Sequence, residues 1–142
     1  MILWDVTLWV YAFRSDSPLH EVARREIENG SRSGDAYLFC PWVVASFLRL
    51  VTNPRIFVRP SGIEEAWAFA DTLESRDRAV KADIDPMTYG VFKHVCLVSR
   101  VVGNDVPDAL LASVAIRHDA TLVTADRGFG RYEGLSCRYL ET

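Results

Sequence analysis

The chain has 142 residues, 49% of them hydrophobic, and a formal net charge of −3. This length allows one domain with a substantial core, so we expect a single domain over residues 1–142. A normal apolar fraction with little net charge excludes a disordered chain. No run approaches the ~18 apolar residues of a membrane-spanning helix. Asp5 interrupts the first apolar run, which argues against a signal peptide, and we expect a cytoplasmic protein.

Short apolar segments alternate with longer amphipathic ones along the chain. The former are typical of buried strands and the latter of helices packed on a sheet. In chain order we expect a strand over 1–6, a helix over 17–30, a strand over 37–40, helices over 42–51 and 61–75, a strand over 81–84, helices over 87–102 and 107–117, and strands over 120–124 and 136–140.

Local signals support some of these boundaries. Ser17 is a suitable N-cap with Pro18 in the first helical position, and Gly30 is a plausible C-terminal stop. The inward stripe of helix 61–75 is expected to contain Ile63, Ala66, Trp67, Ala70 and Leu73.

The alternation of continuously apolar strands with helices predicts an α/β fold, with a mostly parallel sheet of about five strands covered on both faces. Such three-layer α/β/α folds bind ligands at the carboxyl ends of the strands, where the strand order reverses. Polar residues that directly follow a strand are therefore the first candidates for a site.

Three carboxylates occupy such positions. Asp5 ends the first strand, Asp126 follows the strand 120–124, and Asp108 lies in the first turn of the helix before that strand. A carboxylate within an apolar run is costly unless something pairs with it, and lysines are nearly absent, which points to a divalent cation. Mg²⁺ or Mn²⁺ prefers carboxylate oxygens and would support hydrolysis of a phosphodiester bond.

Each carboxylate also has a structural alternative. Asp108 can complement the helix dipole, Asp105 can act as N-cap, and Asp126 before Gly128 can be a turn residue. Asp5 has no easy alternative of this kind.

The other reactive residue types carry weaker signals. The three cysteines are widely spaced and the histidines are unpaired, so buried thiols are expected rather than a zinc site. All basic residues except Lys81 and Lys93 are arginines. This excess suits a phosphate ligand, although biased codon usage produces it as well. Arg14 and Arg127 are candidate RNA contacts, with ion pairs or solvated positions as the alternative.

Four segments resemble the PIN-domain ribonucleases, and more closely the VapC toxins of bacterial VapBC toxin–antitoxin pairs. They are Met-Ile-Leu-Trp-Asp-Val-Thr-Leu-Trp-Val-Tyr-Ala at 1–12, Val-Ala-Ser-Phe-Leu-Arg-Leu-Val-Thr-Asn-Pro-Arg-Ile-Phe at 44–57, Asn-Asp-Val-Pro-Asp-Ala-Leu-Leu-Ala-Ser-Val-Ala at 104–115 and Ala-Thr-Leu-Val-Thr-Ala-Asp-Arg-Gly-Phe at 120–129.

The resemblance implies a five-stranded parallel sheet, an acidic pocket for Mg²⁺ or Mn²⁺, and endonucleolytic cleavage of tRNA or rRNA that inhibits translation. It also implies a homodimer and inhibition by a VapB-type antitoxin. By motif match, Asp5 and Asp108 would be the metal ligands and Asp126 a further catalytic carboxylate. Thr7 and Thr124 lie where small polar side chains support such a site.

The sequence departs from the family pattern at two positions. Ser46 stands where many members have a glutamate, and Gly128 where a further aspartate is common. Fewer carboxylates weaken metal binding, although Asp105, one helical turn before Asp108, would offset the loss if it faced inward. The alternative function is a catalytically weakened PIN domain that binds RNA or a protein without cleavage.

A phosphate-accepting domain that uses Asp5 is a further alternative. Such a site would need a lysine after one of the last strands, whereas Lys81 and Lys93 both precede the strand that leads to Asp126. This arrangement argues against phosphotransfer.

Overall fold

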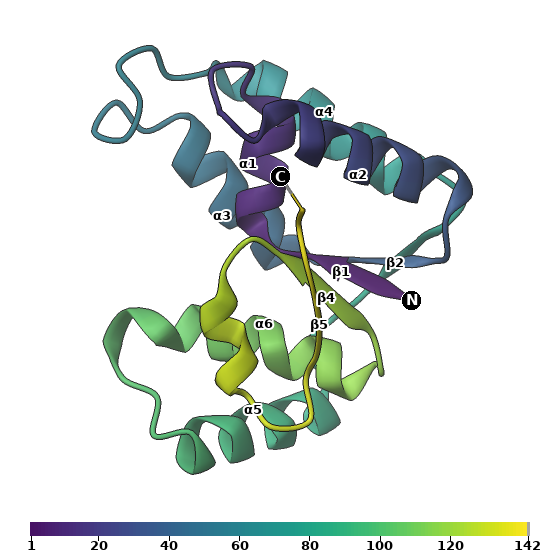
Figure 1. The fold of residues 1–142 in the computed structure, drawn as a ribbon, viewed down its shortest axis with the longest axis vertical. Coiled ribbons are helices and arrows are strands. Elements are labelled where there is room, and N and C mark those ends of the chain that lie inside the picture. Colours follow the sequence, from purple (N-terminus) through teal and green to yellow (C-terminus); the bar gives the residue numbers. More distant parts are fainter. Residues whose placement is uncertain (142) are drawn as a thin grey trace.

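The computed structural model describes residues 1–141 and contains one sheet of five parallel strands in the order β3-β2-β1-β4-β5 (Figure 1). Each neighbouring pair of strands is parallel. The strands are β1 (Ile2–Trp4), β2 (Tyr37–Phe39), β3 (Ala79–Lys81), β4 (Thr121–Thr124) and β5 (Ser136–Tyr139). The predicted parallel sheet is confirmed.

Six α-helices cover the two faces of this sheet: α1 (Val6–Phe13), α2 (His20–Ser33), α3 (Pro41–Val51), α4 (Ile63–Ser75), α5 (Pro86–Val98) and α6 (Val106–Arg117). From β1 to β3 the chain moves in one direction across the sheet, and it then returns to β4. Because such crossovers are right-handed, α1 to α4 lie on one face and α5 and α6 on the other. Figure 1 shows these two layers, which confirms the predicted α/β/α fold.

The strand order reverses between β1 and β4. Their parallel register pairs Leu3 with Leu122 and Trp4 with Val123. The N–H of Asp5 donates to the carbonyl of Val123 at 3.0 Å, which extends the pairing past the end of β1. The next residue of β4 is Thr124, so the register itself sets Asp5 beside Thr124 at the carboxyl edge of the sheet.

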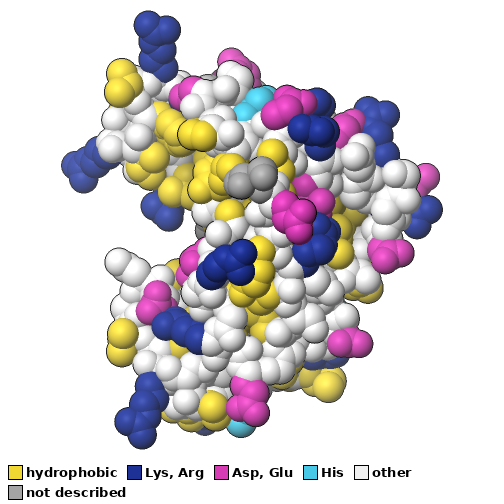
Figure 2. Space-filling model, in the orientation of Figure 1, with side chains coloured by type: hydrophobic (Ala, Val, Ile, Leu, Met, Phe, Trp, Pro, Cys, Tyr) yellow, Lys and Arg dark blue, Asp and Glu magenta, His cyan; other side chains and the backbone are white. Residues whose placement is uncertain are grey.

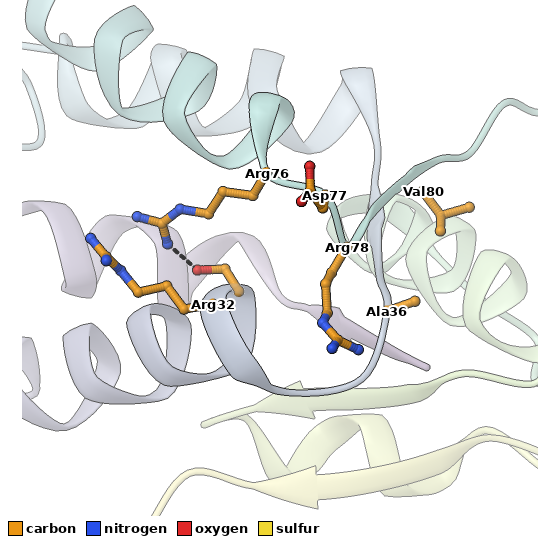
Figure 3. A pocket seen from close by; sticks show the side chains of 7 residues that line it. Arg32, Ala36, Arg76, Asp77, Arg78 and Val80 are labelled. Atoms are coloured by element: carbon orange, nitrogen blue, oxygen red, sulfur yellow. Dashed lines mark hydrogen bonds between the residues drawn. The ribbon is translucent and has the colours of Figure 1, made fainter.

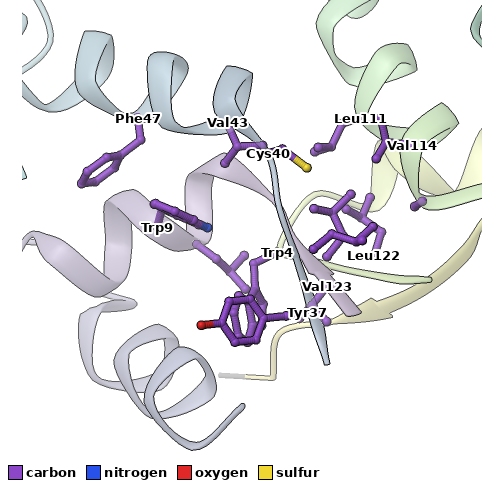
Figure 4. Close-up of a cluster of buried hydrophobic side chains, with 14 of the residues drawn as sticks. Trp4, Trp9, Tyr37, Cys40, Val43, Phe47, Leu111, Val114, Leu122 and Val123 are labelled. Atoms are coloured by element: carbon purple, nitrogen blue, oxygen red, sulfur yellow. The ribbon is translucent and has the colours of Figure 1, made fainter. Parts of the chain in front are cut away.

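The core lies on both faces of the central strands (Figure 4). On the side of α1 to α4, the rings of Trp4 and Tyr37 lie 4.8 Å apart, and those of Trp9 and Phe47 lie 5.6 Å apart. On the other side the cluster includes Leu111 and Val114 of α6 and Leu122 of β4. Within residues 1–141, no helix is both long and apolar enough to cross a membrane.

Two strand predictions need correction. The strand expected over 1–6 ends at Trp4, and α1 begins at Val6, where no helix was predicted. Residues 6–13 are apolar on nearly every side, so they lack the one-sided periodicity that reveals a helix. The third strand is β3, two to three residues earlier than the expected 81–84, because it pairs with β2 in the register that joins Tyr37 to Ala79.

Several helix boundaries also differ from expectation. Helix α2 begins at His20 rather than Pro18 and continues through Gly30 to Ser33. Helix α5 ends at Val98 rather than 102, because Arg100 takes a left-handed conformation with φ of 51°. On α4, Ile63 and Trp67 face outward with 45% and 48% exposure, so the expected inward stripe is narrower.

Gly30 lies inside α2 because α2 packs closely on Trp4. A Cβ atom at Gly30 would lie 2.6 Å from Cζ2 of the Trp4 ring, and that ring is only 1% exposed. The absence of a side chain therefore allows the helix to approach β1.

We expect Gly30→Ala to lower the free energy of unfolding by ~1–2 kcal/mol, because overpacking against Trp4 outweighs the better helix propensity of alanine. Gly90→Ala in α5 is the matched control, since nothing lies within 4 Å of a Cβ atom there. That variant should gain ~0.5–1 kcal/mol. Urea denaturation measures both, and equal effects of the two substitutions would contradict the role of Gly30.

Candidate active site

The Asp5 carboxylate lies at the junction of β1 and α1, where it is 3% exposed. Its Oδ2 atom accepts hydrogen bonds from two hydroxyls, Oγ1 of Thr124 at 2.8 Å and Oγ1 of Thr7 at 3.0 Å. Thr124 comes from the adjacent strand β4, and Thr7 from the first turn of α1. These contacts hold one buried carboxylate in a defined orientation.

Thr124 also connects Asp5 to Asp126. Its Oγ1 accepts from the backbone N–H of Asp126 at 3.0 Å while donating to Asp5. Oδ1 of Asp126 accepts from the N–H of Gly128 at 2.8 Å, at the start of the 3-10 helix η2 (Arg127–Arg131). This is the turn role foreseen for Asp126, and it leaves the second carboxylate oxygen outside the turn.

Asp108 approaches from the opposite layer, in the first turn of α6, and is half-buried. Burial and, to a smaller extent, the negative charges of Asp5 and Asp126 together raise its pKa to about 6. The pKa of Asp5 is also raised, because its burial outweighs the hydrogen bonds from Thr124 and Thr7. The three carboxylates are therefore close enough to repel one another.

Asp105 lies beside this group at the end of the 3-10 helix η1 (Gly103–Asp105), and its charge also raises the pKa of Asp108. It occupies the N-cap position of α6 without a side-chain capping hydrogen bond. Its carboxylate instead pairs with Arg131 at 3.3 Å. Arg131 lies over the ring of Tyr132, 4.7 Å from the ring centroid. The ion pair between Asp105 and Arg131 joins η1 to η2, and no spacing in the sequence predicts it.

Ser46 and Arg127 are two further residues that the sequence predicts for the site. Ser46 is half-buried on α3, and its hydroxyl makes no hydrogen bond within residues 1–141. Arg127 is exposed and stacks on Tyr139, with 4.5 Å between the guanidinium and the ring centroid. Tyr139, at the end of the edge strand β5, was not foreseen as a neighbour of the site.

Arg14 is engaged in holding a loop. Its guanidinium donates to Asp16, to the carbonyl of Arg59 at 2.7 Å and to Ser61 at 2.9 Å. It also lies over the Phe57 ring at 4.0 Å. These contacts connect the end of α1 to the loop between α3 and α4, and they use most of the N–H groups that a phosphate would need.

The donor chemistry fits a hard divalent cation. Among the described residues, no three His, Cys, Asp or Glu side chains are already gathered closely enough to hold a metal ion. Mg²⁺ commonly needs only one or two protein carboxylates, with water and substrate oxygens completing its shell. Asp5 and Asp108 meet that requirement in type and in electrostatics.

One side of the molecule is hollowed. Figure 2 shows a notch between the part of the molecule formed by α3, α4 and their loop and the part formed by α5 and α6, with both acidic and basic side chains along its lower wall. In Figure 1, β1 runs toward this notch. The notch is open to solvent on the side toward which β1 runs.

Comparisons with known proteins show which family the chain belongs to. The family model of the PIN domain matches residues 2–135. Ribonuclease VapC43 of Mycobacterium tuberculosis is 32% identical over 139 residues, which cover 98% of this chain and 95% of that protein. Ribonuclease VapC31 of the same species is 33% identical over 132 residues, which cover 93% of each chain.

A solved structure shares the fold. A chain in the crystal structure of VapBC2 from Rickettsia felis, bound to a DNA fragment from their promoter, has a TM-score of 0.74 and 20% sequence identity. The similarity covers 99% of this chain and 100% of that one. The family match, the identity to named ribonucleases and the shared α/β/α fold together show that this chain belongs to the PIN-domain family and is a relative of the VapC ribonucleases.

Proposed function

We propose that this protein is a Mg²⁺- or Mn²⁺-dependent endoribonuclease, the toxin of a type II toxin–antitoxin pair, which cleaves tRNA or rRNA in the cytoplasm and thereby inhibits translation. The observation that carries the proposal is the buried Asp5 carboxylate, which Thr7 and Thr124 hold in place close to the charges of Asp108 and Asp126. Relatives named as VapC ribonucleases, similar over nearly the whole chain, support it.

Charge explains why a metal belongs in this site. Asp5, Asp108 and Asp126 repel one another, and the nearby cation Arg131 pairs with Asp105 instead. A phosphodiester brings another negative charge to the same place. A divalent cation, when bound by Asp5 and Asp108, would neutralise the developing charge of the transition state and favour deprotonation of the attacking water.

The protein residues have distinct roles in this proposal. Thr7 and Thr124 fix the orientation of Asp5, so the carboxylate needs no reorganisation when substrate arrives. Asp126 keeps one carboxylate oxygen on the Gly128 N–H and can accept a proton from the attacking water with the other. The half-buried Ser46 supplies no charge, so the site depends on fewer carboxylates than is usual in the family.

Exposed apolar side chains support the proposal that the protein binds other proteins. Met87, Tyr89 and Leu97 of α5 are 64%, 63% and 68% exposed. In the loop between α3 and α4 Val58 is 99% exposed, and on α4 Trp67 is 48% exposed. These apolar groups are available for contacts with other proteins, and the structural neighbour is a VapBC complex. We propose a homodimer and a VapB-type antitoxin as the partners.

The repulsion among the carboxylates predicts that Asp108→Asn stabilises the metal-free protein at pH 7. With its pKa raised from 3.8 to about 6, Asp108 binds a proton more tightly in the folded state than in the unfolded state. The free energy of unfolding therefore falls as the pH rises from about 4 to about 6. The variant should be ~1–2 kcal/mol more stable at pH 7, less than the full pKa difference implies because solvent screens a half-buried group.

Urea denaturation in EDTA between pH 4 and pH 7.5 measures this effect. The gain should disappear near pH 4, and part of the slope should remain because the pKa of Asp5 is raised as well. Mn²⁺ should stabilise the wild type at pH 7 and should stabilise Asp108→Asn much less. A variant less stable than the wild type at pH 7 would show that Asp108 makes favourable contacts instead.

The nuclease activity itself is tested with purified, antitoxin-free protein and total bacterial RNA. We expect discrete fragments with Mn²⁺ or Mg²⁺ and none with EDTA. Asp5→Asn and Asp108→Asn should each reduce the cleavage rate by at least ~100-fold, because each removes a ligand for the cation. Asp71→Asn, an exposed position on α4, is the matched control and should cleave like the wild type.

Absence of cleavage by folded protein, together with retained RNA binding, would favour the non-cleaving PIN domain. Cleavage that persists in EDTA or in Asp5→Asn would contradict the metal mechanism. The role of Asp105 is tested separately, by titration of Asp105→Asn with Mn²⁺. An unchanged affinity would show that Asp105 does not replace the missing glutamate.

A further inference from the structure

A second hollow lies at the opposite edge of the sheet from the carboxylates. It has a volume of about 830 Å³ and lies between the end of α2, the segment after α4 and the starts of β2 and β3 (Figure 3). Its lining residues are Ser31, Arg32, Ala36, Arg76, Asp77, Arg78 and Val80. Three of these residues are arginines, and the proposed nuclease mechanism uses none of them.

Two of the arginines are held in place. The guanidinium of Arg76 donates to the Glu28 carboxylate at 3.3 Å and to the hydroxyl of Ser31, which is 2% exposed. Arg32 pairs with the same Glu28 carboxylate from one turn along α2. Glu28 therefore positions two guanidinium groups side by side, and Figure 3 shows Arg32 and Arg76 reaching toward each other.

Arg78 provides the charge that is not balanced. Within the described part of the chain its side chain forms no ion pair or hydrogen bond, and it lies on the other side of the hollow in Figure 3. The hollow and its border contain three guanidinium groups but only two carboxylates, those of Glu28 and Asp77. The hollow therefore has an excess of positive charge. Guanidinium groups bind phosphate oxygens through paired N–H donors.

The arrangement suits a polymer better than a small ion. The Arg32 side chain is 68% exposed, whereas that of Arg76 is 18% exposed, so a ligand here would stay largely in water. Small-molecule sites usually bury most of their ligand. Arg32 and Arg76 lie side by side and Arg78 lies across the hollow from them, which suits successive phosphates of a backbone better than one small anion.

The overall charge of the protein gives such a local site a role in RNA binding. The chain has a net charge of −3, and its candidate active site is lined by carboxylates. Bulk electrostatics therefore does not attract RNA, and a local cluster of arginines would favour its binding. The strand β2 between the two edges is buried along its length. An RNA that contacts both edges must therefore pass around the surface of the molecule, which a folded RNA is large enough to do.

We propose that Arg32, Arg76 and Arg78 form a second RNA-binding site, which holds the sugar-phosphate backbone of a folded RNA while its scissile bond lies at the carboxylates. The identity of the ligand as RNA rests on the proposed function. The site contributes affinity without base recognition, because phosphate contacts carry no sequence information.

The test compares Arg32→Ala/Arg78→Ala with Arg24→Ala/Lys93→Ala. Arg24 matches Arg32 closely, since it is an exposed residue of α2 paired with a glutamate of the same helix, Glu21. Lys93 is an exposed cation on α5. Arg76 is left intact because its contacts support the fold. Equal urea midpoints of the two double variants establish that both are folded.

The affinity for a folded tRNA pool is measured by fluorescence anisotropy in EDTA over a series of salt concentrations. Arg32→Ala/Arg78→Ala should bind ~5- to 10-fold more weakly at low salt, and the slope of log K against log salt should fall by ~1–2. The control should match the wild type. With Mn²⁺, cleavage of a short single-stranded oligonucleotide should be unchanged in both, because it does not reach the second site.

An affinity and salt slope equal to those of the control would overturn the proposal. So would binding of inorganic phosphate, or of a polyglutamate peptide, that is lost in Arg32→Ala/Arg78→Ala while RNA affinity is unchanged. Binding of tRNA that depends on these arginines, in a protein that cleaves no RNA at all, would uphold the site and overturn only the nuclease proposal.

Discussion

The hydrogen bond from Thr124 to Asp5 is the contact on which the candidate site depends. It joins the ends of two strands that are 119 residues apart in the chain and lie side by side only because the sheet reverses its order there. The same hydroxyl accepts from the backbone of Asp126, so one threonine positions two carboxylates. Without the register that pairs Trp4 with Val123, the two carboxylates would not lie close enough to α6 to affect the pKa of Asp108.

The burial of Asp5 and its need for polar partners could be predicted from the sequence, because a carboxylate in an apolar run is unusual. A carboxylate in an apolar run requires a compensating partner, and that requirement is visible without a structure. The fold class could be predicted for a similar reason, since continuously apolar strands between helices imply a sheet covered on both faces. Helix α1 was not visible, because a helix that is buried on most sides has little periodicity.

Contacts between distant segments explain the rest of what was missed. Gly30 looks like a helix stop in the local sequence, yet it lies inside α2 because Trp4 occupies the space that a side chain would need. The pairing of Arg131 with Asp105 depends on how η1 and η2 pack beside α6. Neither local spacing nor composition contains that information, and only the folded chain brings these residues together.

The distribution of charge gives the two edges of the sheet different roles in the proposed function. A site that binds a cation through carboxylates repels the polyanion that it acts on, and a chain with net negative charge adds to that repulsion. Arginines placed next to the carboxylates would compete with the metal for them, as the ion pair of Arg131 with Asp105 illustrates. Arginines at the far edge avoid this competition, since β2 and the buried core separate Arg32, Arg76 and Arg78 from Asp5. A folded RNA, which is large enough to touch both edges, is the kind of substrate for which this separation of binding from chemistry is useful.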